Sequence, residues 1–306
     1  METLAAKNTS MIAILLATFN GERYLSEQLK SIGNQSDVEV FIVASDDCSI
    51  DCTPQLLKRA PTDSCPLILL PYQKLGSAAA NFFRLLRDAD LTHVDYVALS
   101  DQDDIWQADK LSQAVQNILG NNVDAYSSNV TAFWPNDKQK LINKAQPQQQ
   151  WDYMFESAGP GCTFVLTQKL ALDLQSFLIA NKEKCQHIAL HDWFIYAFAR
   201  SRGFKWLIDH EAHMLYRQHA ENVVGANVGI KAKLIRWQKL REGWLVKQAL
   251  LIADILGYND AWPIQKLKRY HLVDRLALIA NVNKLRRRLR DRIALALFLL
   301  MPLKKI

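Results

Sequence analysis

Short apolar stretches alternate with amphipathic ones along the first 120 residues of the chain. The apolar runs that have the length of buried strands are residues 12–19, 38–44, 67–70 and 94–99. Between them, apolar residues recur at helical spacing, as over residues 22–32 and 77–88. Short strands that alternate with helices predict βαβ units and a mostly parallel sheet.

The pattern is less regular after residue 104. It predicts a helix over 107–119 and one strand over 123–133, whereas the polar stretch 136–150, which ends in QPQQQ, predicts a flexible surface loop. The later predicted elements are a turn and strand over 159–167, helices over 168–180 and 191–201, and strands over 204–209 and 212–217. From Ile230 onward we expect a helical, basic region.

Composition narrows the class of protein. The 306 residues are 49% hydrophobic and include 11 Gly and 9 Pro, which excludes a collagenous or largely disordered chain. Five cysteines are too few, and odd in number, for a disulfide-rich secreted scaffold. Cys48 and Cys52 are spaced CxxxC with no histidine cluster beside them, so we expect no zinc site and a cytoplasmic protein with reduced thiols.

Charge is unevenly distributed along the chain. Residues 230–306 contain 18 Lys and Arg against 5 Asp and Glu, a net charge of +13, whereas the preceding 229 residues have a net charge of −7. A basic segment favours phosphate-bearing partners, either nucleic acid or an anionic membrane surface. Because no nucleic-acid-binding motif is present, we expect no nucleic acid as a partner. A non-enzymatic, basic nucleic-acid-binding or membrane-binding protein is the alternative from a different class.

Both ends of the chain carry apolar runs. Met11–Phe19 lacks the flanks of a signal peptide and predicts a buried strand. Ile293–Leu300 follows the Arg-rich residues 284–292 and is too short to span a bilayer. Two interpretations stay open for this C-terminal segment. It attaches to an anionic membrane surface, or it docks its leucine face on the core and exposes a charged back.

The candidate chemistry lies where strands end, because parallel sheets bind ligands at the carboxyl ends of their strands. No dinucleotide-binding glycine motif or P-loop is present. Instead, Asp101, Asp103 and Asp104 place three carboxylates within four residues. Hard oxygen ligands suit Mg²⁺ or Mn²⁺, which often complete their coordination with substrate phosphates. The structural alternative is an N-cap cluster for the following helix. A metal-dependent phosphohydrolase is a third alternative for the function.

Several ordered motifs together resemble the family 2 glycosyltransferases. They are ATFNGERYLSEQLKSI, VEVFIVASDDCSIDCT, NFFRLL, VDYVALSDQDDIWQADKL, SAGPGCTFVLTQKLAL, HDWFIYAFAR and YRQHAENVVGA. The string SDQDDIW followed by DKL is similar to the bacterial rhamnosyltransferase-like branch. The resemblance implies an α/β, Rossmann-like GT-A fold over residues 1–228, with a nucleotide-binding half at about 11–120 and an acceptor half at about 121–228. A basic helical region over 229–306 would follow.

The same resemblance implies roles for individual residues. Asp192 would be the catalytic base, and Asp101, Asp103 and His219 would hold the metal. The implied nucleotide-sugar-binding residues are Ala17, Phe19, Glu22, Asp47, Asp101 and Arg217, and the implied acceptor-side residues are Gly161, Cys162, His191 and Trp193. Cys48 and Cys52 replace glycines that are usual in the family motif, so a left-handed backbone at either position would be mildly strained.

The activity implied is an inverting, metal-dependent sugar transfer from a nucleotide diphosphate. dTDP-L-rhamnose is the favoured donor and a UDP-hexose the alternative. The acceptor would be a hydroxyl of a growing or polyprenyl-diphosphate-linked glycan, in the synthesis of a cell-surface polysaccharide such as lipopolysaccharide. The enzyme would then work on the inner face of the cytoplasmic membrane.

Overall fold

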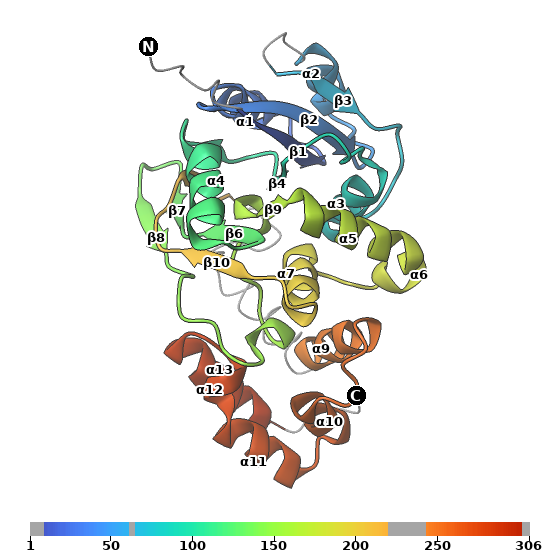
Figure 1. Cartoon of the computed structure of the whole chain (residues 1–306), viewed down its shortest axis with the longest axis vertical. Helices are drawn as coiled ribbons and strands as arrows, with labels where there is room; N and C mark the ends of the chain where they lie inside the picture. Colours follow the sequence, from blue (N-terminus) through green and yellow to red (C-terminus); the bar gives the residue numbers. More distant parts are fainter. Residues whose placement is uncertain (1–8, 61–64, 220–242, 302–306) are drawn as a thin grey trace, which may run out of the picture.

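The computed structural model describes residues 9–60, 65–219 and 243–301. A seven-stranded sheet has the order β10-β6-β9-β4-β1-β2-β3 and forms the centre of the molecule (Figure 1). Its strands are β1 Ser10–Thr18, β2 Val38–Asp46, β3 Leu67–Leu69, β4 Tyr96–Ser100, β6 Ala125–Ser128, β9 Val165–Thr167 and β10 Trp206–Asp209. All the pairings are parallel except those of β9 with β4 and β6, so the predicted mostly parallel sheet is confirmed.

Helices cover both faces of this sheet because its strands are apolar on both sides. In β1, Ala13 and Leu15 join an apolar cluster with α3, α5 and α7, whereas Ile12 and Ile14 join a second cluster with α1, α2 and α4. The helices are α1 Leu25–Gly33, α2 Thr53–Arg59, α3 Ala78–Asp88, α4 Lys110–Asn121, α5 Gln168–Ala180, α6 Lys182–Cys185 and α7 His191–Ser201. Continuous apolar strands are typical of sheets that are buried on both faces.

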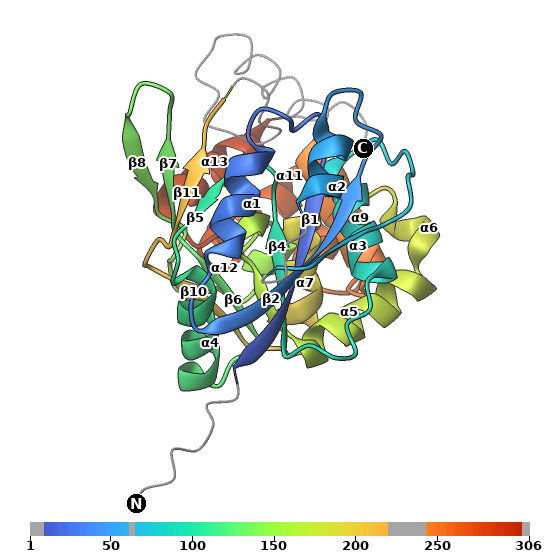
Figure 2. The ribbon, with the colours of Figure 1, turned by 90° about the horizontal axis from the view of Figure 1, so that it is seen from above.

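A second, four-stranded sheet lies beside the first and has the order β5-β11-β7-β8 (Figure 2). Its strands are β5 Ile105–Trp106, β7 Val130–Phe133, β8 Gln139–Ile142 and β11 Met214–Arg217. Strand β4 of the large sheet ends at Ser100 and β5 of the small sheet begins at Ile105. The acidic residues Asp101–Asp104 are therefore the link between the two sheets.

Two predictions about this region are wrong. The single strand expected over 123–133 is divided between the two sheets at Asn129. The side chain of Asn129 accepts the N–H groups of Lys144 (2.6 Å) and Ala145 (3.1 Å) and donates to the carbonyl of His210 (2.7 Å). The flexible loop expected over 136–150 instead contains β8, which pairs antiparallel with β7. Pairing with a distant strand ordered this polar segment, and its local sequence gave no such signal.

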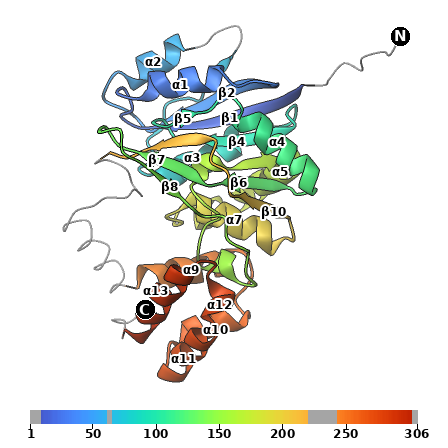
Figure 3. The ribbon, with the colours of Figure 1, turned by 90° about the vertical axis from the view of Figure 1, so that its left-hand side faces the viewer.

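The C-terminal helices form a further layer beneath α7, at the end of the molecule away from β1–β3 (Figures 1 and 3). They are α9 Trp244–Ile255, α10 Trp262–Arg269, α11 Leu272–Ala280, α12 Val282–Leu285 and α13 Leu289–Leu300. Their buried side chains belong to the same apolar cluster as α3, α5 and α7. The expected domain boundary after residue 228 lies outside the described residues. Within the described residues, no helix has both the length and the apolar character needed to cross a bilayer.

Candidate active site

Three loops meet at the carboxyl edge of the large sheet, after β1, β2 and β4. The first two are joined by hydrogen bonds. Asp46 accepts the hydroxyl (2.6 Å) and backbone N–H (2.8 Å) of Ser49, and the Ser49 hydroxyl in turn accepts the N–H of Asn20 (2.8 Å). The carboxylate of Glu22 accepts the N–H of Cys52 (2.9 Å). The structure therefore places Glu22 in the loop framework at this edge.

Asp47 holds a third segment, the chain that leads into α3. Its carboxylate accepts the N–H of Leu75 and that of Gly76, the latter at 2.8 Å from Oδ2. Gly76 has a φ of +82°, a left-handed conformation that glycine adopts without strain. A carboxylate has about four acceptor positions, so Asp47 retains capacity for the N–H of a base.

Gln102 was not identified from the sequence, yet it joins the β1 loop to the acidic loop. Its amide accepts the backbone N–H of Phe19 (2.8 Å) and donates to the carbonyl of Phe19 (2.9 Å). A Cβ at Gly21 would lie 2.3 Å from the Gln102 Oε1 atom, so the loop needs a glycine there. The Phe19 ring is 55% exposed and Ala17, at the end of β1, is nearly buried. An exposed ring at this edge can stack on a base.

The acidic loop concentrates negative charge in a largely buried place. Burial raises the pKa of Asp101 to about 7, and the carboxylates of Asp103 and Asp192 add to this rise. Asp104 is fully buried, and burial together with Asp103 and Asp101 raises its pKa well above the usual range. The Oδ2 atom of Asp104 has no hydrogen-bond partner among the described residues. Like charges this close together favour protonation or a neighbouring cation.

Strand β11 brings Arg217 and His219 to this loop. Arg217 donates its backbone N–H to Asp104 (3.1 Å) and its Nε–H to the carbonyl of Asp103 (2.7 Å), and its guanidinium pairs with Glu27. The Nε2 atom of His219 lies 2.6 Å from a carboxylate oxygen of Asp103. The structure therefore brings Arg217 and His219, two of the implied site residues, into direct contact with the acidic loop.

A buried lysine balances part of this charge. Lys110 is 3% exposed and its Nζ atom lies 3.5 Å from the centre of the Trp106 ring, a cation–π contact. Burial lowers the pKa of Lys110 to about 8, while Cys162 and Asp104 oppose this change. Lys110 could not be predicted as a site residue, because nothing in its local sequence pattern indicates that it is buried.

Asp192 stands in the first turn of α7, where helix N–H groups favour negative charge. Its carboxylate accepts the N–H of Trp193 at 2.7 Å. Burial raises the pKa of Asp192 to about 6, and the positive charge of Lys144 acts in the opposite direction. A carboxyl group with this pKa is ionised near neutral pH and can accept a proton.

The predicted acceptor-side residues divide into two groups. Gly161 and His191 lie together, since a Cβ at Gly161 would be 2.4 Å from His191 Nε2, an atom without a hydrogen-bond partner among the described residues. The His191 ring stacks on Phe82 at 4.0 Å, and burial lowers its pKa to about 3, so it is neutral.

The other two predicted acceptor-side residues, Trp193 and Cys162, are buried. Trp193 is 2% exposed and donates its indole N–H to the carbonyl of Tyr153 (2.9 Å), so it packs in the core. Cys162 is fully buried, and its thiol lies close enough to Asp104 for that carboxylate to raise its pKa. Gly161–Thr163 is a 3₁₀ turn before β9, which matches the turn and strand predicted over 159–167 and places Gly161 and Cys162 in the turn. The local sequence could not show that these two side chains point inward.

The acidic loop and its neighbours offer side-chain atoms that could bind a divalent cation. Asp101, Asp104 and Cys162 bring their ligand atoms within 4.8 Å of one another. The pKa of the Cys162 thiol is raised well above its usual value by burial and by Asp104, so the thiol is protonated and unsuited to a hard ion. Asp101 and Asp103 offer carboxylate oxygens, and His219, whose Nε2 atom lies 2.6 Å from Asp103, offers an imidazole; these are donor types that Mn²⁺ or Mg²⁺ accepts, but the three do not form a comparably close group among the described residues.

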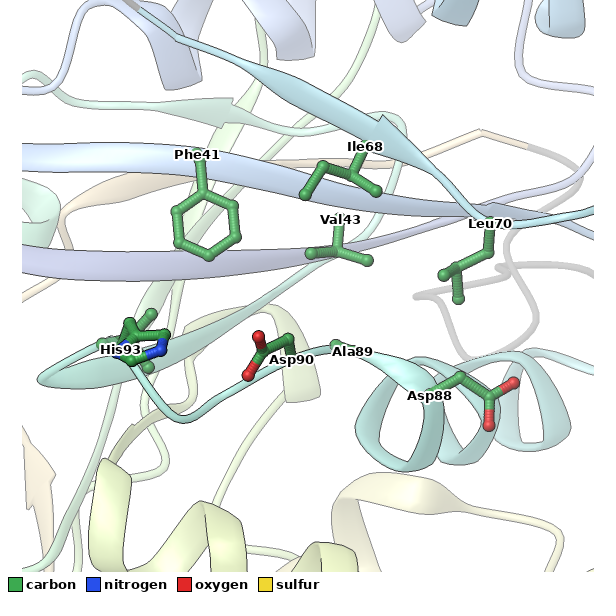
Figure 4. A pocket seen from close by; sticks show the side chains of 9 residues that line it. Phe41, Val43, Ile68, Leu70, Asp88, Ala89, Asp90 and His93 are labelled. Atoms are coloured by element: carbon green, nitrogen blue, oxygen red, sulfur yellow. The ribbon is translucent and has the colours of Figure 1, made fainter.

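A cavity of about 310 Å³ lies elsewhere, between strands β2 and β3 and the end of α3 (Figure 4). Apolar side chains of the two strands form its wall, while Asp88, Asp90 and His93 lie on its other side. His93 precedes β4, whereas the acidic loop follows the opposite end of that strand. This cavity is therefore separate from the carboxylate site.

A charged network connects α7 to the C-terminal helices. The Arg287 side chain is 1% exposed, and its guanidinium donates to Asp152 (3.0 Å) and to the carbonyl of Ser157 (2.5 Å). Asp152 also accepts the hydroxyl of Tyr196 (3.0 Å) and pairs with Arg200 (3.4 Å), both on α7. The expectation that Arg287 belongs to a solvated basic face is wrong, because its charge is neutralised by acidic groups distant in the sequence.

The fold, the acidic loop between the sheets and the buried carboxylate on α7 define a nucleotide-sugar glycosyltransferase of the GT-A type. The chain belongs to glycosyl transferase family 2, whose family model matches residues 13–187. It is 43% identical over 288 residues to the dTDP-rhamnosyl transferase RfbG of Shigella flexneri, which covers 94% of this chain and 99% of that protein. The resemblance inferred from the sequence motifs is thereby confirmed.

Other known proteins agree with this assignment. The chain is 25% identical over 177 residues to the Escherichia coli protein WfgD, a UDP-Glc:alpha-D-GlcNAc-diphosphoundecaprenol beta-1,3-glucosyltransferase, covering 56% of this chain and 66% of that one. The fold is similar to the mannosyltransferase PcManGT of Pyrobaculum calidifontis in complex with GDP-Man and Mn²⁺, with a TM-score of 0.53, 16% identity, and 95% and 85% of the two chains covered. It is also similar to TarS of S. aureus in complex with UDP, with a TM-score of 0.53, 15% identity, and 94% and 88% covered.

Proposed function

We propose that this glycosyltransferase moves L-rhamnose from dTDP-L-rhamnose to a hydroxyl of a lipid-linked or growing glycan. The transfer inverts the anomeric configuration and serves the synthesis of a cell-surface polysaccharide at the inner face of the cytoplasmic membrane. The half-buried Asp192, in the first turn of α7 and near enough to Asp101 for its carboxylate to raise the pKa of that group, carries the proposal. The similarity to a dTDP-rhamnosyl transferase over nearly the whole chain supports the choice of donor.

The β1 and β2 loops would bind the nucleotide. The exposed Phe19 ring offers a stacking surface for thymine, above Ala17. Asp47 would accept the imide N–H of the base with its remaining capacity, and Glu22 would line the ribose pocket. Arg217 would reinforce the side of the loop that faces the diphosphate, since it already holds the carbonyl of Asp103.

In the reaction, the acceptor hydroxyl oxygen bonds to the anomeric carbon while the bond from that carbon to the diphosphate oxygen breaks. The hydroxyl proton passes to Asp192, whose ionised carboxylate is the base. The electron pair of the broken bond leaves with dTDP. One base on the side opposite the leaving group produces inversion, and the transition state has oxocarbenium character.

Asp101, Asp103 and His219 would hold Mg²⁺ or Mn²⁺. A divalent ion bound there neutralises the charge that develops on the diphosphate. Asp104 would act differently, since its link to the Arg217 backbone N–H fixes β11 against the acidic loop. The positive charge of Lys110, which is buried beside Asp104, would lower the electrostatic free energy of holding several carboxylates close together.

A UDP-hexose is the second candidate donor. The similarity to WfgD, a glucosyltransferase that uses UDP-Glc and a diphosphoundecaprenol acceptor, favours it. That similarity also supports a lipid-linked acceptor for this chain. The two donors differ at the base and at the sugar, so direct competition separates them.

The test is a transfer assay with dTDP-L-rhamnose and UDP-glucose, each with Mg²⁺, Mn²⁺ or EDTA, and with calorimetry of dTDP and UDP binding. We expect turnover with dTDP-L-rhamnose, its loss with EDTA, and loss of metal-dependent dTDP binding in Asp103→Ala. Asp192→Asn should abolish transfer and keep dTDP binding, while Asp173→Asn on α5 is the matched control. Full transfer by Asp192→Asn would refute the role of Asp192 as the base. Turnover with UDP-glucose and none with dTDP-L-rhamnose would mean that a UDP-hexose is the donor.

A further inference from the structure

The outer side of α11 and α13 exposes a cluster of large apolar side chains. We call it the apolar ridge. Its members are between 49% and 74% exposed and are Leu272, Val273 and Leu276 on α11 and Leu289, Ile293, Leu297 and Leu300 on α13. On α13 they follow one another at intervals of four, four and three residues, which places them on one face of the helix. Isolated exposed apolar residues are ordinary, but a contiguous group indicates an interaction surface.

The ridge belongs to a firmly packed element. The opposite face of α13 contributes Leu295, Phe298 and Leu299 to the main core. The guanidinium of Arg275, on α11, donates to the carbonyls of Leu299 (3.3 Å) and Leu300 (3.2 Å), so the C-terminal end of α13 lies against α11. The C-terminal segment therefore docks on the core, yet its outward face is apolar where the sequence alternative expected a charged back.

The charges beside the ridge indicate its partner. Apart from Arg287, which is buried against Asp152, residues 262–301 include nine Lys and Arg against two Asp and no Glu. The two acids are already paired, Asp274 with Lys266 (2.8 Å) and Asp291 with Arg290 (3.3 Å). Two copies that met ridge to ridge would bring their basic surroundings together, which costs electrostatic energy. An anionic bilayer instead offers apolar chains to the ridge and phosphate groups to its basic rim.

We propose that the apolar ridge inserts into the headgroup boundary of an anionic membrane and that the basic residues around it bind the lipid headgroups. Leu289, Ile293 and Leu297 would lie among the acyl chains near the boundary, with Arg290 at headgroup level. The proposal rests on the proposed function in one respect, since a lipid-linked acceptor would lie in the same membrane. The surface itself is defined by exposure and charge and needs no assumption about the donor.

The test is flotation of the full chain with vesicles of phosphatidylcholine, with or without phosphatidylglycerol. We expect binding to the anionic vesicles that weakens with added salt. The double variant I293E/L297E should reduce the bound fraction at least about tenfold, because two charged groups would have to enter the apolar boundary. The matched control is Leu119→Glu, since Leu119 is 67% exposed on α4, in another part of the molecule.

Each outcome decides the question. Equal binding by I293E/L297E and wild type, or no binding of the wild type to anionic vesicles, overturns the proposal. A wild-type dimer without lipid that I293E/L297E converts to a monomer would assign the ridge to a second copy. Val273→Glu on α11 is a second variant that should also reduce binding. Calorimetric binding of dTDP should be unchanged in all these variants, so a failure of the membrane proposal is distinguishable from a failure of the proposed function.

Discussion

Arg287 is predicted to contribute more to stability than any surface arginine of the C-terminal helices. The substitution Arg287→Met keeps much of the apolar volume of the side chain and removes its charge. It deletes the hydrogen bonds to Asp152 and to the Ser157 carbonyl and leaves Asp152, which is fully buried, with one arginine at 3.4 Å. Removal of one partner of a buried ion pair costs about 3–5 kcal/mol, a large share of a typical free energy of unfolding of about 5–15 kcal/mol.

The measurement is urea unfolding of the wild type, Arg287→Met and Arg290→Met. Arg290 belongs to the same segment but is 78% exposed and pairs with its neighbour Asp291, so its loss should cost under about 1 kcal/mol. The double variant R287M/D152N should recover part of the loss, because the uncompensated carboxylate is then gone. If Arg287→Met unfolds within about 1 kcal/mol of the wild type, the network does not hold the C-terminal helices, and our account of it is refuted.

Three further predictions concern the site and its loops. The value of kcat/KM should fall below about pH 6, because Asp192 is then protonated. Lys144→Met should move this acidic limb of the pH profile to higher pH, because the positive charge that lowers the pKa of Asp192 is lost. An unmoved limb would show that Lys144 does not influence the pKa of Asp192. Gly161→Ala should reduce kcat at least about tenfold, since its Cβ would lie 2.4 Å from His191 Nε2, and unchanged kinetics would show that the ring moves aside at little cost. Cys48 has a φ of +57°, a left-handed conformation that is strained for a residue with a side chain. Cys48→Gly should therefore raise the free energy of unfolding by about 0.5–1 kcal/mol, measured by thermal or urea unfolding. A destabilised variant would mean that the contacts of the Cys48 side chain stabilise the fold by more than the strain costs.

The sequence predicted the parts of the fold that local patterns determine. The apolar runs that became β1, β2 and β4 end directly before the residues that form the site, so the carboxyl-edge rule placed the acidic loop correctly. The strain suspected at the two replaced glycines is found at Cys48, whereas Cys52 has an ordinary φ of −79°. These features depend on a few consecutive residues.

The features that the sequence did not predict depend on partners far along the chain. Arg287 and Asp152 are 135 residues apart, and Gln102 and Phe19 are 83 apart. A run of arginines has the same local pattern whether its members face water or a buried carboxylate. The break at Asn129 likewise depends on loops that approach it only in the folded chain.

The position of the acidic loop between the two sheets has a mechanical consequence. Asp101 directly follows a strand of the large sheet, and Asp103 is tied through Arg217 to a strand of the small sheet. Any rotation of one sheet against the other changes the spacing of these two carboxylates. A donor that binds to both carboxylates would restrict the motion of one sheet relative to the other. Amide hydrogen exchange in β5 and β11 should therefore slow when the donor binds. Slower exchange in β5, which carries none of the residues implied in donor binding, would then report donor occupancy at a distance from the donor.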